Sequence, residues 1–374
     1  MNHLDPNFQR LMQEATRLTQ SGNLQAATAA IQSALGGSAI DVNKAWSTDG
    51  LSIFDRVRDV IDVEAREVGE RTAPDAAKPM TSAPSAASGS GPRFIAGSHI
   101  DPAAGTREYK LFIPSAAASG DAPLPLVVML HGCTQNPDDF AAGTQMNAAA
   151  EAQGLFVLYP SQSQRANPQR CWNWFKHSHQ KRGRGEAALL AGMTQAVMEG
   201  HAIDRRRVYV AGLSAGGAMA AILGREYPDL YAAVGVHSGL AAGAASDLPS
   251  AMAAMGSGGG KAPAVGSGTP TIVFHGDADA TVHPRNAEHV VAASAGHASA
   301  VEVDRRQGQG GRPHTRHVHR AADGRVLAES WTVHGAPHAW AGGSAKGSFT
   351  DRRGPDATAE MLRFFMEHPR PAAH

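Results

Sequence analysis

A serine flanked by glycines stands between a β-branched run and an alanine-rich segment. The stretch from Val208 reads VYVAGLSAGGAMA, with the spacing G-x-S-x-G centred on Ser214. A catalytic serine must sit at a tight strand-to-helix turn, where flanking glycines let neighbouring backbone pack closely. A helix that begins just after it offers free N–H groups to a developing negative charge. We therefore expect Ser214 to be a nucleophile.

A serine hydroxyl is a poor nucleophile and needs a base, which in turn needs a carboxylate to orient it. Two apolar runs further along the chain end in residues of these types. One run is followed by Asp277 and Asp279, and the other by His334 and His338. Position alone selects neither one aspartate nor one histidine.

An apolar run upstream, Leu126–Leu130, leads into His131, Gly132 and Cys133. A glycine here lets the chain approach a substrate oxygen, and the N–H of Cys133 could donate a hydrogen bond to that oxygen. We expect the backbone of Cys133, rather than its thiol, to serve the chemistry, because Ser214 already fits the role of nucleophile.

A second cysteine, Cys171, opens the aromatic stretch CWNWF, which contains Trp172 and Trp174. Two of the five tryptophans so close together favour either an apolar wall for a substrate or a loop folded onto the core. A disulfide between Cys133 and Cys171 is plausible in an oxidising compartment and less so in cytoplasm.

Composition excludes several classes of protein. The 34 Lys and Arg balance the 34 Asp and Glu, which gives no field to attract nucleic acid. No apolar stretch reaches the roughly 18–20 residues of a membrane helix, and no secretory signal is visible at the start. The basic tract 312–320 contains His317 and His319 among arginines, which disfavour a metal site, so we expect no bound metal.

The chain divides into three predicted regions. Apolar residues at helical spacing predict a helical hairpin within residues 1–71, and a Pro-, Ala- and Ser-rich linker spans residues 72–92. Residues 93–370 alternate apolar runs with helix-like segments, which predicts a mostly parallel sheet covered by helices on both faces. The predicted strands are Tyr109–Pro114, Leu126–Leu130, Leu155–Tyr159, Val208–Ala211, Ala232–His237 and Thr271–His275, and the predicted helices include Glu186–Glu199 and Gly216–Glu226. Residues 239–268 are expected to lack regular structure.

Taken together, five motifs resemble those of the poly(3-hydroxybutyrate) depolymerase family of esterases. They are HGCTQ from His131, CWNWF from Cys171, GLSAGGAM from Gly212, HGDADATV from His275 and GAPHAWAGG from Gly335. The resemblance covers about residues 93–370 and follows the family's order. It implies an α/β-hydrolase fold and a serine esterase that uses no cofactor.

The resemblance also chooses among the candidate residues. It implies Ser214 as nucleophile, Asp279 as the acid and His338 as the base, with an oxyanion hole made by the amides of Cys133 and Ala215. We further expect four rings to line the substrate site: His131, Trp172, Trp174 and Trp340.

The implied substrates are short-chain hydroxyalkanoate polyesters or oligomers. Feruloyl and acetylxylan esterases share overlapping motifs, so a carbohydrate esterase is the first alternative, and a granule-binding protein without catalysis is the second. The N-terminal hairpin resembles the arrangement in intracellular members, which predicts a cytoplasmic enzyme whose helices contact a storage granule. Secretion without a readable signal is the alternative location.

Overall fold

The structure is a computed structural model, and it describes residues 91–101, 105–258, 268–306 and 311–371. The predicted hairpin, residues 1–71, and nearly all of the predicted linker lie outside the described residues. Granule contact by the hairpin therefore stays a prediction, which polymer binding by a chain lacking residues 1–71 would test. No helix within the described ranges is long and apolar enough to cross a membrane.

Strands and helices alternate through most of the described chain. In order they are β1 (Arg93–Asp101), β2 (Gly105–Ile113), β3 (Leu124–Leu130), α3 (Pro137–Thr144), α4 (Met146–Gln153), β4 (Phe156–Pro160), α5 (Gly185–Gly200), β5 (Ile203–Leu213), α6 (Ala215–Glu226), β6 (Ala233–His237), α7 (Leu248–Ser257), β7 (Thr271–Gly276), α8 (Arg285–Ala295), β8 (Ala300–Arg306), β9 (His314–Arg320), β10 (Val326–Val333), β11 (Trp340–Ala341), β12 (Thr350–Asp351) and α9 (Ala357–Glu367). All six strands and both helices predicted from the apolar runs are present.

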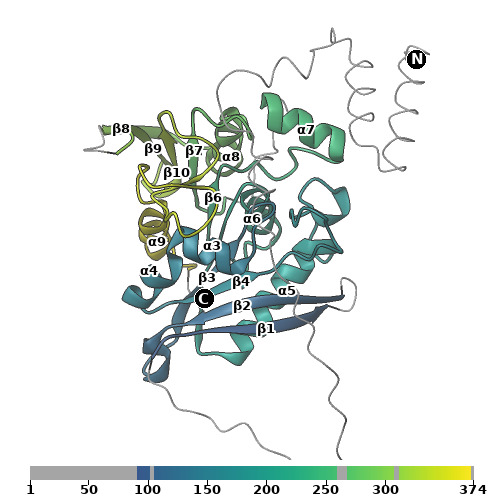
Figure 1. Cartoon of the computed structure of the whole chain (residues 1–374). Helices are drawn as coiled ribbons and strands as arrows, with labels where there is room; N and C mark the ends of the chain where they lie inside the picture. Colours follow the sequence, from purple (N-terminus) through teal and green to yellow (C-terminus); the bar gives the residue numbers. More distant parts are fainter. Residues whose placement is uncertain (1–90, 102–104, 259–267, 307–310, 372–374) are drawn as a thin grey trace, which may run out of the picture. The chain divides into compact units, whose positions relative to one another are not determined.

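One large sheet organises the described part of the chain (Figure 1). Its order is β1-β2-β4-β3-β5-β6-β7-β10-β9-β8. The central strands β4, β3, β5, β6, β7 and β10 run parallel, whereas β1, β2, β8 and β9 pair antiparallel at the two edges. The central strands are continuous apolar runs because side chains on both faces are buried.

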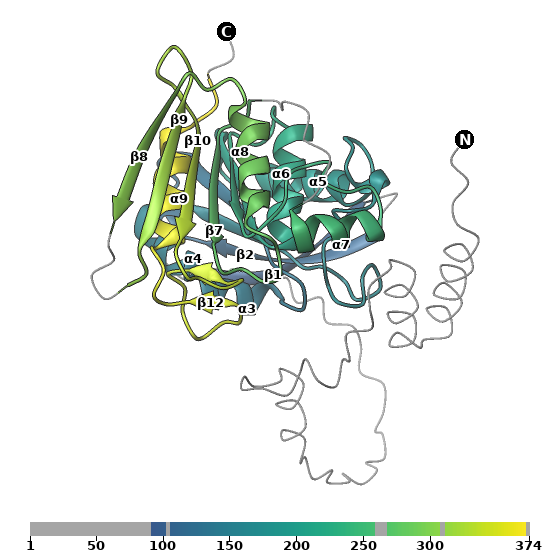
Figure 2. The same cartoon turned by 90° about the horizontal axis from the view of Figure 1, so that it is seen from above.

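Helices cover both faces of the sheet, as expected. Buried residues of α5, α6 and α8 form one core with one face, and those of α3, α4 and α9 form a second core with the other. Figure 2 shows these two groups of helices on opposite sides of the strands.

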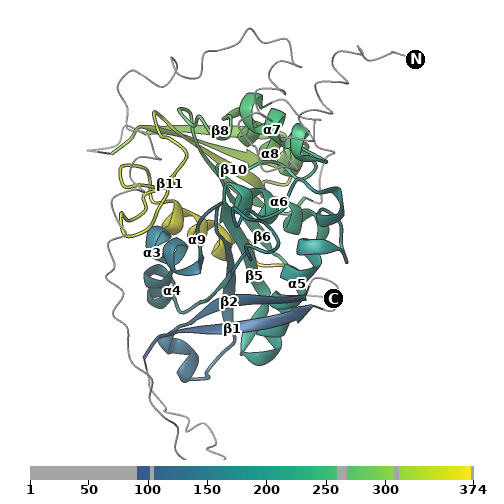
Figure 3. The ribbon, with the colours of Figure 1, turned by 45° about the vertical axis from the view of Figure 1, so that its right-hand side comes forward.

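The connections bring several strand ends to one edge. From β3 the chain crosses to β4 on one side and from β4 to β5 on the other side of β3. Such a reversal leaves a crevice at the carboxyl ends of the strands, which is where ligands bind in open α/β sheets. Figure 3 shows the β1–β2 hairpin at one edge of the sheet and β8 beyond β10 at the other, with β5 and β6 between them.

The expectation that residues 239–268 lack regular structure is wrong for α7 (Leu248–Ser257). Asp247 accepts a bond from the Ser250 N–H, and the Ser250 hydroxyl accepts from the Asp247 N–H. This reciprocal cap and Pro249 in the first turn start a helix in a sequence otherwise rich in Ala, Gly and Ser. Residues 259–267 lie outside the described part.

The turn from β5 into α6 packs directly onto β3. A Cβ placed on Gly216 would lie 2.0 Å from the carbonyl oxygen of Leu130, and one on Gly212 would lie 2.6 Å from the same oxygen. Real Cβ atoms do not approach backbone so closely, so only glycine allows this contact. The glycines of the G-x-S-x-G motif thus fix the serine turn against the neighbouring strand.

Replacing Gly216 by alanine is therefore expected to lower the free energy of unfolding by about 3 kcal/mol, because backbone must shift to admit the methyl group. Gly200→Ala is the matched control. A Cβ at Gly200 meets nothing within 4 Å. The free energy of unfolding of the Gly200→Ala variant should therefore stay the same or rise by up to about 1 kcal/mol. Urea unfolding measures both, and equal stability of the two variants would contradict the packing argument.

Candidate active site

Ser214 occupies the turn between β5 and α6 in a strained conformation. Its backbone has φ 57° and ψ −119°, a combination that favours glycine. The Ser214 N–H donates to the carbonyl oxygen of His237 at 2.9 Å, which ties the turn to the end of β6. The residue is 9% exposed. The fold therefore holds one strained, accessible hydroxyl at the carboxyl edge of the sheet.

Asp279 lies after β7 with its side chain fully buried. One carboxylate oxygen accepts the backbone N–H groups of Thr281 and Val282 at 2.9 and 2.8 Å. The other lies 2.7 Å from Nδ1 of His338 and 3.3 Å from Nε2 of His275. Burial alone would raise the pKa of Asp279, but the bonds from the two histidines and the Val282 N–H outweigh it and hold the pKa well below its ordinary value.

His338 follows β10 and lies at the surface end of this pair. Its side chain is 11% exposed, whereas that of Asp279 is fully covered. Because Asp279 is ionised, Nδ1 of His338 carries the proton of their shared bond. In the neutral ring the second nitrogen, Nε2, is then the one free to accept a proton, as a general base requires.

His237 ends β6, which lies between the strand that precedes the serine and the strand that precedes Asp279. Burial is the main cause that lowers the pKa of His237 well below its usual range, so its ring is neutral. The backbone oxygen of His237 is the acceptor for Ser214. The predicted nucleophile follows β5, and the predicted acid and base follow β7 and β10, with the buried His237, which sequence reasoning did not single out, at the end of β6 between them.

The turn after β3 lies beside the serine. A Cβ on Gly132 would be 3.6 Å from the Cβ of Ser214, and the Gly132 N–H donates to Gln135 Oε1 at 2.9 Å. Neither the N–H of Cys133 nor that of Ala215 has a hydrogen-bond partner among the residues that the structure describes. These are the two donors predicted for an oxyanion.

The alternatives left open by position form a second, more exposed pair. His334 Nδ1 lies 2.8 Å from Asp277 Oδ2, and the ring's other nitrogen lies 2.8 Å from the Thr315 hydroxyl. Asp277 also accepts the N–H of Gly335 at 2.6 Å. Burial would raise the pKa of Asp277, but the bonds from His334 and Gly335 lower it. This pair joins the loop after β7 to the loop that carries His338.

A disulfide joins the turn after β3 to the aromatic loop. Cys133 and Cys171 are bonded and lie 38 positions apart in the sequence. Nearby, Glu186 of α5 accepts bonds from the side chain of Gln162 and from the N–H and the side chain of Asn173, each at 2.6 Å. Burial would raise the pKa of Glu186, but bonds from His179, Gln162 and Asn173 lower it. An ionised carboxylate therefore anchors the loop from inside.

The four rings predicted to line a substrate site are all buried. Trp172, Trp340, His131 and Trp174 are at most 4% exposed. Burial lowers the pKa of His131 to about 4, so its ring is neutral; Nε2 accepts the Gln162 N–H, and Nδ1 donates to the Gly132 oxygen. Trp172 and Trp174 belong to the core formed with α5 and α6, and Trp340 to the core formed with α9, so contact of these rings with a substrate stays a prediction.

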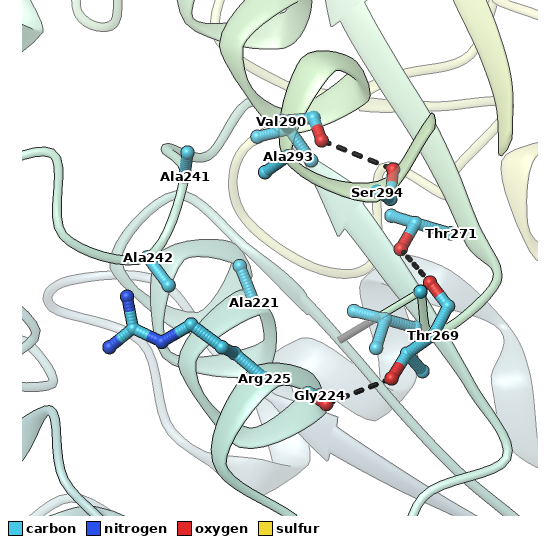
Figure 4. Close-up of a pocket in the computed structure, with 12 residues that line it drawn as sticks. Ala221, Gly224, Arg225, Ala241, Ala242, Thr269, Thr271, Val290, Ala293 and Ser294 are labelled. Atoms are coloured by element: carbon cyan, nitrogen blue, oxygen red, sulfur yellow. Dashed lines mark hydrogen bonds between the residues drawn. The ribbon is translucent and has the colours of Figure 1, made fainter. Parts of the chain in front are cut away.

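Two hollows of very different size lie outside this constellation. Figure 4 shows a cavity of about 40 Å³ between α6, α8 and β7, where Thr269 and Ser294 bond backbone oxygens of Gly224 and Val290. It has room for little more than a few water molecules. A groove of about 1320 Å³ runs from the β1–β2 hairpin to Gln162.

Most of the basic tract forms strand β9 (His314–Arg320). The rings of His317 and His319 lie 6.5 Å apart. Within the described ranges, no group of three His, Cys, Asp or Glu is placed to hold a metal ion.

Several known proteins are similar to this chain in sequence. Poly(3-hydroxyalkanoate) depolymerase C of Paucimonas lemoignei is 33% identical over 231 residues, covering 58% of this chain and 55% of that protein. Feruloyl esterase B of Thermothelomyces thermophilus is 34% identical over 132 residues, or 35% of this chain and 44% of that protein. The chain thus spans about half the length of the curated relatives it matches.

Among solved structures, an acetyl xylan esterase from Aspergillus awamori has a TM-score of 0.53 at 18% identity and covers 73% of this chain and 99% of that one. This likeness confirms the predicted α/β-hydrolase fold. The family described as esterase PHB depolymerase matches residues 107–309, which is more than half of the chain. The chain therefore belongs to the esterase PHB depolymerase family.

Proposed function

We propose that this protein is a serine esterase that hydrolyses short-chain hydroxyalkanoate esters. The observation that carries the proposal is the 2.7 Å bond between Asp279 and His338, and a strained serine that opens helix α6 supports it. The family and the depolymerase relative support the reaction class and the substrate class.

In the proposed mechanism the Ser214 oxygen attacks the ester carbonyl carbon while Nε2 of His338 takes the hydroxyl proton. The N–H groups of Cys133 and Ala215 stabilise the oxyanion, each contributing about 3–4 kcal/mol. The C–O bond to the alcohol then breaks, and the alcohol leaves with the proton held by His338. Water activated by the same ring cleaves the acyl-enzyme and releases the acid.

A carbohydrate esterase is the second candidate, because feruloyl and acetylxylan esterases are also among the relatives. The mechanism would be unchanged and only the pocket would differ. A non-catalytic granule-binding protein, the third candidate, fits less well because the acid–base pair is intact.

A kinetic panel distinguishes these candidates. Hydroxybutyrate oligomers should be hydrolysed with higher kcat/KM than feruloylated or acetylated sugars, and Ser214→Ala should abolish turnover of every ester, because no other nucleophile is expected. Ser294→Ala, remote from the site, is the control. Turnover confined to the sugar esters would overturn the polyester assignment, and full turnover by Ser214→Ala would overturn the mechanism.

The two Asp–His pairs allow a matched test of the acid. Asp279→Asn should lower kcat about 10³–10⁴-fold, because an amide leaves the imidazole in the wrong tautomer. Asp277→Asn should lower it less than tenfold, since that pair only helps to position the His338 loop. The reverse order of effects would assign catalysis to the other pair.

Asp279→Asn should also change how the free energy of unfolding depends on pH. The folded-state pKa of Asp279 lies below the ordinary value of 3.8, so the ionised group stabilises the fold above that pH. This contribution is lost as the pH falls through the folded pKa. The stability difference between wild type and Asp279→Asn should therefore shrink on acidification below about pH 4, as urea unfolding at several pH values would measure.

The disulfide is relevant to the compartment in which the protein is found. Structural disulfides persist in oxidising compartments, so the Cys133–Cys171 bond favours export over the cytoplasm as the proposed location. Closing a loop of this length is expected to stabilise the fold by about 4 kcal/mol. The double variant Cys133→Ser, Cys171→Ser should lose that much in urea unfolding. Equal stability of wild type with and without reductant would show that the bond is not formed.

A further inference from the structure

The large groove lies on the side of the sheet where β2 forms a hairpin with β1. Its walls come from that hairpin, from the first turn of α3 and from the loop 161–170, and its volume is about 1320 Å³. None of the residues proposed for the acid–base chemistry lines it. The groove therefore needs an explanation of its own.

Positive charge predominates in the groove. The basic side chains that line it are Arg107, Lys110, Arg165 and Arg170, and the acidic ones are Glu108 and Asp138. Lys110 and Asp138 pair with each other. The guanidinium groups of the three arginines make no hydrogen bond or ion pair with any residue that the structure describes, and they outnumber the remaining carboxylate, Glu108.

Of the three arginines, Arg107 gives the strongest indication of a bound anion. It is only 9% exposed, and its Nε is enclosed with no hydrogen-bond partner in the part of the chain that the structure describes. Guanidinium groups stay charged, and a buried charge without a partner is costly. An anion in the groove would offset this charge.

The loop 161–170 links the groove to the turn after β3, because the Thr134 N–H donates to the Gln169 oxygen at 2.7 Å. Gln162 lines the groove and donates its N–H to Nε2 of His131 at 3.1 Å, and His131 precedes the turn that faces Ser214. Burial is the main cause that lowers the pKa of His131, and the charge of Arg170 lowers it further. A ligand held by the arginines would thus extend toward the oxyanion turn.

We propose that the groove binds the carboxylate of the substrate's alcohol fragment, so that the enzyme prefers acid-terminated oligomers of hydroxy acids. This inference rests on the proposed function. In such an oligomer the free carboxylate always lies on the alcohol side of the cleaved ester, whereas the alcohol of an acetyl or feruloyl sugar ester is neutral. Arginine forks match carboxylates in charge and shape.

The test compares one hydroxybutyrate trimer as the free acid and as its methyl ester. In full-length protein, Arg107→Gln, Arg165→Gln and Arg170→Gln should each lower the ratio of kcat/KM for acid over methyl ester several-fold to about tenfold. Arg305→Gln, an exposed arginine on β8, should leave the ratio unchanged. Added salt should lower the wild-type ratio, because exposed charges are screened.

An unchanged ratio in all three groove variants would overturn the proposal. Arg165 is exposed and Arg170 half-buried, so these two variants keep the test valid if Arg107→Gln fails to fold. If wild type hydrolyses both trimers, but neither the arginine substitutions nor salt change the ratio of kcat/KM, the carboxylate site is wrong and the proposed function stands. If wild type hydrolyses neither trimer but cleaves sugar esters, the proposed substrate class fails with it.

Discussion

A buried carboxylate that stays ionised is the feature on which the candidate site depends. Asp279 has no exposed side-chain surface, and a charge in such a place is tolerated only when donors surround it. Two backbone N–H groups and two histidine rings meet that need. Because one of the rings is His338, the bond that keeps the carboxylate charged also sets the tautomer of the proposed base.

The rest of the fold fixes the positions of this bond and of the serine. Parallel strands place the ends of β3, β5, β7 and β10 along one edge, and glycines let the β5–α6 turn press against β3. Other anchors act from behind the site. Gln135 fixes the turn after β3, Glu186 fixes the aromatic loop, and a disulfide joins the two. Preorganisation of this kind is what allows fixed amides to stabilise a developing charge.

Much of the fold could be predicted because its signals are local. The apolar runs predicted the central strands, and the G-x-S-x-G spacing predicted the turn between β5 and α6. The exposed edge strands β1 and β8 have no such run, since few of their side chains are buried. Helix α7 was missed because its start depends on one cap, Asp247 with Ser250, in a sequence of low complexity.

The site was less predictable where contacts span long stretches of sequence. Both Asp–His pairs form, so spacing alone could not have distinguished them, and only the motif pattern favoured Asp279 with His338. Glu186 accepts a hydrogen bond from the Asn173 N–H, and the His237 oxygen accepts one from the Ser214 N–H. No sequence pattern predicts either bond. The aromatic residues near Cys171 suggested a substrate wall, yet Trp172 and Trp174 are core residues, because aromatic side chains gain most from burial.

The most direct test of the account is a crystal structure of the protein after reaction with a serine-reactive phosphonate. The phosphorus should be bonded to the Ser214 oxygen, with one phosphoryl oxygen about 2.7–3.1 Å from the N–H groups of Cys133 and Ala215. Nε2 of His338 should face the Ser214 oxygen while Nδ1 keeps its bond to Asp279. An adduct on another residue, or a phosphoryl oxygen directed away from both amides, would contradict the account.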